Sequence, residues 1–251
     1  MKKKHYLFSI LGIILILTTA LLIYRTYFSQ PEPFLSNKQI INNINYFLPG
    51  DPANKVQDVL QVDSHHFFVP FITKVGHYGT SYWVWKKHEW KIQYAANSGE
   101  PRLWQIDLKD PSTFCIVWSL NPIEEVSNID FYLSQDRDYS INNGTEHYYS
   151  PKVQMKKRVE VNQKSYGILK LPNEWSTVIE SVVKAKTEGQ PSLFTEINLN
   201  QKMYFGWVPY DSSSKVATPG SKDDYAGYGY SNGNKNLEYV RYLNESELES
   251  E

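Results

Sequence analysis

The chain has 251 residues and a nearly balanced charge, with 26 Lys and Arg against 27 Asp and Glu. The first 28 residues hold four of those cations and no acid, which leaves 22 cations against 27 acids in the remainder. This acidic balance argues against a nucleic-acid-binding protein, because such proteins usually carry a basic excess. Aromatic residues make up 15% of the chain and, together with many Val, Ile and Thr residues, favour β-strands.

The N-terminus predicts a membrane anchor. Lysines at positions 2–4 precede an apolar run from Tyr6 to Tyr24 that contains no Asp, Glu, Lys or Arg. As a helix these 19 residues span roughly 28 Å, about the thickness of a hydrocarbon core. A cleaved signal peptide is the alternative. Its one candidate cleavage site, Thr18-Thr19-Ala20, is followed directly by further apolar residues, so an uncleaved anchor fits better.

The flanking charges predict the orientation of this anchor. The three lysines outweigh Arg25, so residues 1–5 should stay in the cytoplasm and the C-terminal domain should lie outside. We expect a single-pass signal anchor over residues 6–24 and a stalk over residues 25–35, stiffened by Pro31 and Pro33. The single cysteine, Cys115, excludes an internal disulfide, which favours a bacterial envelope protein over a eukaryotic secreted one.

Residues 36–243 predict one extracytoplasmic β-rich domain. It begins with a helix, for which Ser36 and Gln39 form a capping box and which Pro49-Gly50 ends. Candidate strands with turn residues between them follow, which indicates an antiparallel meander, sandwich or curled sheet. These strands are Val56–Val62, Phe67–Lys74, Thr80–Trp85, Trp90–Ala95, Arg102–Asp107, Thr113–Leu120, Ile129–Ser134 and Lys152–Val161.

A second helix follows Pro172, since Trp175, Val178 and Ile179 begin an apolar face with helical spacing. The remaining predicted segments are strands Leu193–Leu199 and Lys202–Val208, a polar loop Asp211–Asn236, a strand Leu237–Leu243 and an acidic tail over residues 244–251. We expect the tail to be solvated and frayed. The predicted fold class is therefore α+β, predominantly antiparallel β-sheet with two helices, preceded by one N-terminal transmembrane helix.

The sequence contains only incomplete matches to known catalytic and metal-binding motifs. Gly229–Gly233 matches G-x-S-x-G, but no helix pattern and no histidine follow it, as a serine hydrolase requires. The loop Asp136–Asn142 places oxygen side chains at alternating positions, but it lacks the glycine and glutamate of an EF-hand, so a polar hairpin loop is the simpler interpretation. The histidines form no zinc signature. The sequence predicts no catalytic residue, no metal site and no cofactor.

Trp85 and Trp90 stand at the two ends of a predicted hairpin loop. One interpretation is a packed cross-strand pair that stabilises the hairpin. The other is an exposed aromatic platform for sugar rings or a partner.

Lys152, Lys156 and Arg158 alternate with apolar residues and predict a cationic strand face. Its simplest role is a solvated surface. The alternative is a surface that binds anionic envelope polymers or lipid headgroups.

The polar loop carries Tyr225, Tyr228 and Tyr230 among Ser, Gly and Asn residues. Long loops are often functional or disordered, and this composition is typical of adaptable binding loops.

The functional hypothesis is a non-catalytic binding, sensing or accessory domain, anchored in the cell membrane by the N-terminal helix. Its partner would be an envelope polymer or another membrane protein, and not a nucleic acid. An envelope-acting hydrolase or transferase with a carboxylate pair is the alternative, although the acidic residues are too scattered to nominate a pair.

Overall fold

The computed structural model describes residues 10–21, 24, 30–122, 125–142, 146–150, 152–161, 164–187, 203–218, 229–233 and 236–249. Residues 10–21 are helical. Within the described ranges, no helix combines the length and the apolar character needed to cross a membrane. The predicted anchor also includes residues 6–9 and 22–23, which lie outside these ranges.

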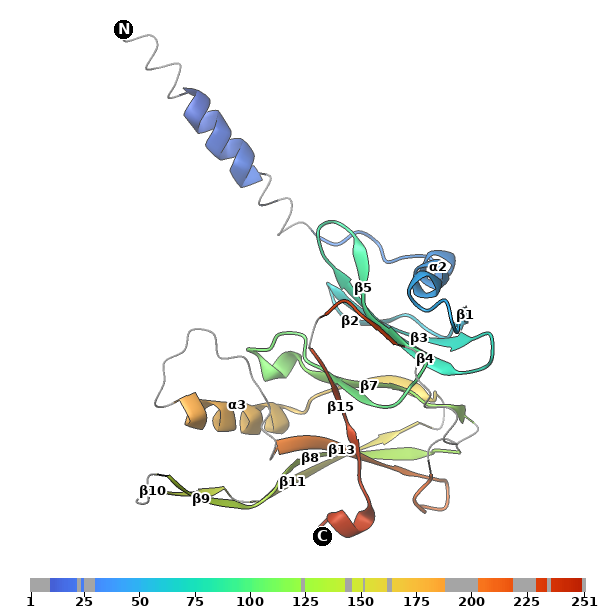
Figure 1. Ribbon diagram of the computed structural model, residues 1–251, viewed down its shortest axis with the longest axis vertical. Helices are drawn as coiled ribbons and strands as arrows, with labels where there is room; N and C mark the ends of the chain where they lie inside the picture. The colour runs from blue at the N-terminus through green and yellow to red at the C-terminus, as the bar shows by residue number, and fades with distance from the viewer. Residues whose placement is uncertain are drawn as a thin grey trace.

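The domain is a stack of three β-sheets (Figure 1), and all strand pairs but one are antiparallel among the described residues. The α+β prediction, with helices beside a predominantly antiparallel sheet structure, is confirmed. The first sheet has the order β1-β3-β4-β5-β14, and β2 also pairs with β3. Its strands are β1 (Ala53–Val56), β2 (Leu60–Asp63), β3 (His66–Thr73), β4 (Tyr78–Trp85), β5 (Trp90–Ala96) and β14 (Gly229–Ser231).

The middle and third sheets have four strands each. The middle sheet contains, in spatial order, β12 (Tyr166–Lys170), β7 (Cys115–Ser119), β6 (Arg102–Trp104) and β15 (Leu237–Tyr239). The third sheet contains β11 (Val153–Glu160), β8 (Asn128–Gln135), β13 (Met203–Tyr210) and β16 (Arg241–Tyr242). The pair β13–β16 is parallel.

Separate apolar clusters hold these layers together. Helix α2 (Asn37–Phe47) covers the outer side of the first sheet with Ile40 and Ile44, which pack near Trp83. Phe68 of the first sheet packs with Trp104 of the middle sheet. The largest cluster lies between the middle and third sheets, where α3 (Asn173–Thr187) also contributes its apolar face. The middle sheet is therefore buried on both faces, as the all-apolar composition around β7 requires.

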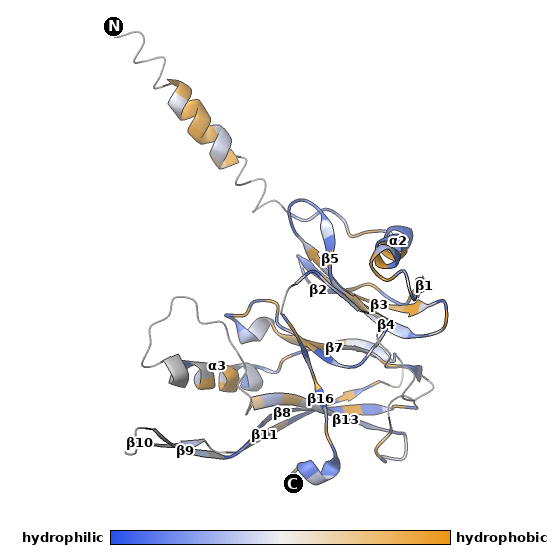
Figure 2. Cartoon of the chain, viewed as in Figure 1, coloured by the Kyte–Doolittle hydropathy of each residue, from blue (hydrophilic) through white to orange (hydrophobic). Residues whose placement is uncertain are grey.

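Helix α2 begins as predicted. The side-chain oxygen of Gln39 accepts hydrogen bonds from the backbone N–H of Ser36 at 3.0 Å and from its hydroxyl at 2.6 Å. This arrangement satisfies a backbone donor that a helix start otherwise leaves unpaired. Figure 2 shows the hydropathy pattern that results, with apolar residues of α2 on the side facing the sheet.

A single C-terminal segment adds an edge strand to all three sheets. Strand β14 pairs with β5, β15 pairs with β6, and β16 pairs with β13. In Figure 1 this segment runs down the stack from the first sheet to the third. The strand predicted over Leu237–Leu243 is therefore two short strands in different sheets, because each pairs with a different layer.

Other predicted segments differ from the observed ones. The strand predicted over Val56–Val62 is divided into β1 and β2. Strand β12 was not predicted. The loop around Asp136 leads into a β-ribbon of β9 (Asp138–Asn142) and β10 (Glu146–Ser150), which continues the β8–β11 register. The strand predicted over Leu193–Leu199 lies outside the described residues.

Candidate functional site

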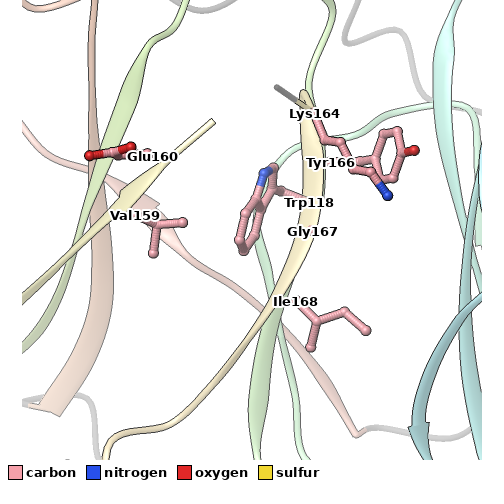
Figure 3. Close-up of a pocket in the computed structure, with 7 residues that line it drawn as sticks. All are labelled: Trp118, Val159, Glu160, Lys164, Tyr166, Gly167 and Ile168. Atoms are coloured by element: carbon pink, nitrogen blue, oxygen red, sulfur yellow. The ribbon is translucent and has the colours of Figure 1, made fainter. Parts of the chain in front are cut away.

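A pocket of about 500 Å³ opens at one edge of the stack, between the middle and third sheets. There the edge strand β12 of the middle sheet lies beside the edge strand β11 of the third sheet (Figure 3). The residues that line the pocket are Trp118, Val159, Glu160, Lys164, Tyr166, Gly167 and Ile168.

Trp118 forms the inner wall on the side of the middle sheet. Its side chain is 3% exposed, and its ring lies 5.3 Å from the ring of Phe131. In the β7–β12 register Trp118 stands opposite Gly167. A Cβ atom at Gly167 would lie 2.6 Å from Cζ2 of the indole, so only glycine lets the ring lie over this strand. On the opposite wall, Val159 and Glu160 come from β11 (Figure 3).

The indole N–H of Trp118 is buried and has no hydrogen-bond acceptor among the described residues. A buried donor without a partner costs about 1–3 kcal/mol, and such groups are uncommon in folded proteins. Trp118 therefore carries an unsatisfied buried donor next to the pocket.

The outer edge of β12 supplies further polar groups. The N–H of Leu120 donates to the carbonyl of Ser165 at 2.8 Å, and the N–H of Leu171 donates to the carbonyl of Phe114 at 3.1 Å. Because the hydrogen-bonding direction alternates along an antiparallel strand, Tyr166 and Ile168 direct their backbone N–H and C=O away from β7. In the described part of the chain β12 pairs with β7 alone. Strand β12 thus offers an open edge beside a pocket lined by both apolar and polar residues.

A polar cluster fixes the start of β12. Lys164 Nζ lies 2.8 Å from Oδ2 of Asp58, and the Tyr166 hydroxyl donates to the same oxygen at 3.2 Å. The hydrogen bond from Lys164 lowers the pKa of Asp58 below its usual value, despite the opposing effect of burial. Figure 3 shows the Lys164 ammonium and the Tyr166 ring on the side of β12 away from Trp118. These polar contacts therefore position the start of the strand.

Trp85 and Trp90 form a cross-strand pair, with ring centroids 5.3 Å apart. They are 9% and 8% exposed, because the chain that enters the domain covers them. The ring of Phe34 lies 5.0 Å from that of Trp90, whose indole N–H donates to the carbonyl of Glu32 at 3.0 Å. This geometry matches a packed pair and leaves little of either ring for a ligand.

The three predicted cationic residues lie on or next to β11, and the contacts of Arg158 and Lys152 are with carboxylates. Arg158 forms two hydrogen bonds with the buried Asp130, at 2.6 and 2.7 Å, which raise the pKa of its guanidinium. Lys152 lies 3.1 Å from a carboxylate oxygen of Glu249. Lys156 is exposed. The acidic tail, predicted to be solvated, thus lies against this face up to residue 249.

Tyr230 lies in β14 rather than in a loop, and its ring stacks on Phe47 of α2 at 4.0 Å. Tyr225 and Tyr228 lie outside the described residues. The structure therefore separates Tyr230 from the cationic strand and from the pocket, since α2 and the third sheet lie on opposite sides of the stack.

Sequence reasoning missed Trp118, Gly167 and the edge of β12. The available signal was a glycine within the short apolar run Tyr166–Leu169, because glycine inside a strand often marks a close approach by another group. Among the described residues, no group of three or more His, Cys, Asp or Glu side chains could hold a metal ion. Comparison with known proteins gave no match, since no family model, no curated protein and no solved structure resembles the chain.

Proposed function

We propose that this protein is a non-catalytic binding domain, anchored at the outer face of a bacterial membrane, that recognises an extended peptide segment of an envelope partner. The segment would add as a strand to the open edge of β12 and insert an apolar side chain between Trp118 and Val159. Backbone hydrogen bonds give affinity in strand addition, and side-chain pockets give specificity.

The pocket beside an open strand edge carries this proposal. Tyr166 and Ile168 line the pocket and direct their backbone N–H and C=O groups outward, where an added strand could pair with them. A hydrolase or transferase with a carboxylate pair has less support. Of the residues that line the pocket, only Glu160 carries a carboxyl group.

The anchored location rests on the N-terminal sequence and on the exposure of its apolar side chains. In the helix over residues 10–21, Leu15 is 68% exposed and Ile16 is 69% exposed. Such a surface is unfavourable in water and favourable in hydrocarbon. The chain then enters the domain at the first sheet, where Phe34 packs.

Site-specific photo-crosslinking in intact cells tests the peptide proposal. A benzoylphenylalanine residue at position 160 should capture a peptide stretch of one partner, whereas the same residue at the exposed position of Lys55 on β1 should not. The decisive variant is Ile168→Pro. It removes an outward-facing N–H and leaves the bonds to β7 in place, as proline on an edge strand allows. Loss of the adduct with an unchanged melting temperature supports strand addition, and its persistence contradicts it.

The anchor has its own test. Mass spectrometry of the membrane fraction should recover peptides that cover residues 22–27, because an uncleaved anchor retains them. A mature N-terminus shortly after Ala20 would show instead that the segment is a cleaved signal peptide.

A further inference from the structure

The outer face of the third sheet, turned away from the middle sheet, has an occupant from the chain itself. Here Leu248 packs against a buried cluster of Tyr132, Val208 and Leu243. The short 3₁₀ helix η3 (Glu245–Glu247) precedes Leu248 and brings the acidic tail across the sheet.

Glu249 is held at three points by β11 and the residue before it. Its N–H donates to the side-chain oxygen of Gln154 at 3.0 Å, and its carbonyl accepts from the Gln154 amide at 3.2 Å. Its carboxylate lies 3.1 Å from Nζ of Lys152. Gln154 thus binds the backbone of the tail, and Lys152 binds the carboxylate of Glu249.

Two other carboxylates of the tail contact a cation or a hydroxyl. Glu247 lies 2.6 Å from Nη2 of Arg241, and Glu245 accepts a hydrogen bond from the Tyr210 hydroxyl at 3.3 Å. Most of these charged side chains are partly exposed, with Arg241 56% and the Glu249 side chain 56% exposed. Exposed ion pairs contribute little each, so a stronger anion can displace the tail.

We propose that this face is a binding surface for a phosphate-bearing polymer, and that the acidic tail is its internal, displaceable occupant. Arginine and lysine side chains bind phosphate oxygens through charge-assisted hydrogen bonds. A polymer presents its anions in succession, as Glu245, Glu247 and Glu249 do. Several weak contacts made at once give it an advantage over single ions. This surface is separate from the peptide pocket and does not depend on it.

The distance of this face from the anchor favours a polymer over membrane headgroups as its ligand. The chain enters the domain at the first sheet, and the cationic face lies on the outer side of the third, about two sheet spacings of roughly 10 Å away (Figure 1). On the proposed anchor, which this step assumes, the face points away from the bilayer and toward the envelope polymers beyond it.

Binding of inorganic polyphosphate to the full-length protein in detergent tests the inference. In the neutralised-tail variant, Glu245→Gln, Glu247→Gln and Glu249→Gln remove the three carboxylates that contact the sheet, and the backbone contacts with Gln154 are kept. We expect the affinity to rise on the order of fivefold at low salt, because an internal competitor for the cations has been weakened. The single Glu249→Gln variant should give a smaller rise in the same direction, and it serves if the triple variant folds poorly.

Two further variants locate the site. In the neutralised-tail background, Arg241→Gln should weaken binding severalfold and reduce its salt dependence. Lys55→Gln, which removes an exposed cation from β1 of the first sheet, should leave both unchanged. Equal effects of the two variants, or no gain from tail neutralisation, would overturn the proposal. Stronger binding to phosphatidylglycerol vesicles than to polyphosphate would overturn the assignment to a polymer.

Discussion

The packing of Trp118 over Gly167 makes a quantitative prediction for Gly167→Ala. The new Cβ would lie 2.6, 2.9 and 3.2 Å from three carbons of the indole, where ordinary contacts begin near 3.4 Å. The ring would have to move by about 0.8 Å, yet it is 3% exposed and packed against Phe131. Overpacking of this kind costs about 1–3 kcal/mol.

A smaller effect opposes this cost, because alanine restricts the unfolded chain and so stabilises by about 0.4–1 kcal/mol. The net expectation for Gly167→Ala is a loss of about 1–2 kcal/mol in the free energy of unfolding. For a domain of this size, that corresponds to a melting temperature lowered by roughly 2–8 °C. Urea denaturation followed by circular dichroism measures the first quantity, and calorimetry measures the second.

The matched control is Gly229→Ala, also at a strand position. Its Cβ would meet only the Tyr94 hydroxyl within 3.4 Å, at 3.3 Å, and that group lies at the end of a side chain. We expect its stability to stay within about 0.5 kcal/mol of the native protein. The indole N–H signal of Trp118 in an NMR spectrum should shift in Gly167→Ala only. If the two variants have equal stability and unchanged indole signals, the described packing of Trp118 is refuted.

Three further predictions concern groups outside the pocket. Burial alone would raise the pKa of Asp51, but hydrogen bonds with His77 at 2.6 Å and with Asn97 outweigh burial and lower it. The ionised Asp51 carboxylate therefore contributes its full stabilisation above about pH 4 and loses it as the pH falls through the lowered pKa. On acidification, the native protein should therefore lose a larger part of its neutral-pH free energy of unfolding than the Asp51→Asn variant. Equal losses in the two proteins between neutral and acidic pH would contradict this. Trp175→Ala should cost about 3–5 kcal/mol in urea denaturation, because that side chain is 2% exposed in the largest core cluster; a loss below 1 kcal/mol would contradict it. Burial raises the pKa of the Cys115 thiol to about 12, so iodoacetamide at pH 8 should modify it only after unfolding, as mass spectrometry can measure; rapid modification of the native protein would show that the thiol is accessible.

The sequence predicted the elements whose signals are local. Helix α2 could be predicted from its capping box, and α3 from the helical spacing around Trp175. Strands β3, β4, β5, β8 and β13 follow from apolar or alternating runs between turn residues. In each case the information lies within about ten neighbouring residues.

Contacts between distant segments could not be predicted in this way. Strand β12 has Lys164 and Lys170 around a short run that is partly buried on both faces, so it shows no clean alternation. The burial of Trp90 depends on Glu32 and Phe34, which lie in the segment predicted to be a stalk. The pairing of Glu249 with Lys152 joins the C-terminal tail to a residue near the middle of the domain sequence, and no single-sequence pattern encodes it.

The C-terminal segment that crosses the stack has a consequence for the order of events after synthesis. Strands β5, β6 and β13 receive their edge partners only from residues 229–242, which follow every other described strand. Until the ribosome has made those residues, each of the three sheets keeps an open edge, and open edges invite pairing with other chains. None of the three sheets can therefore acquire all its strands before the C-terminal segment is synthesised. A nascent chain of this design therefore stays incompletely folded until nearly its whole length has been made.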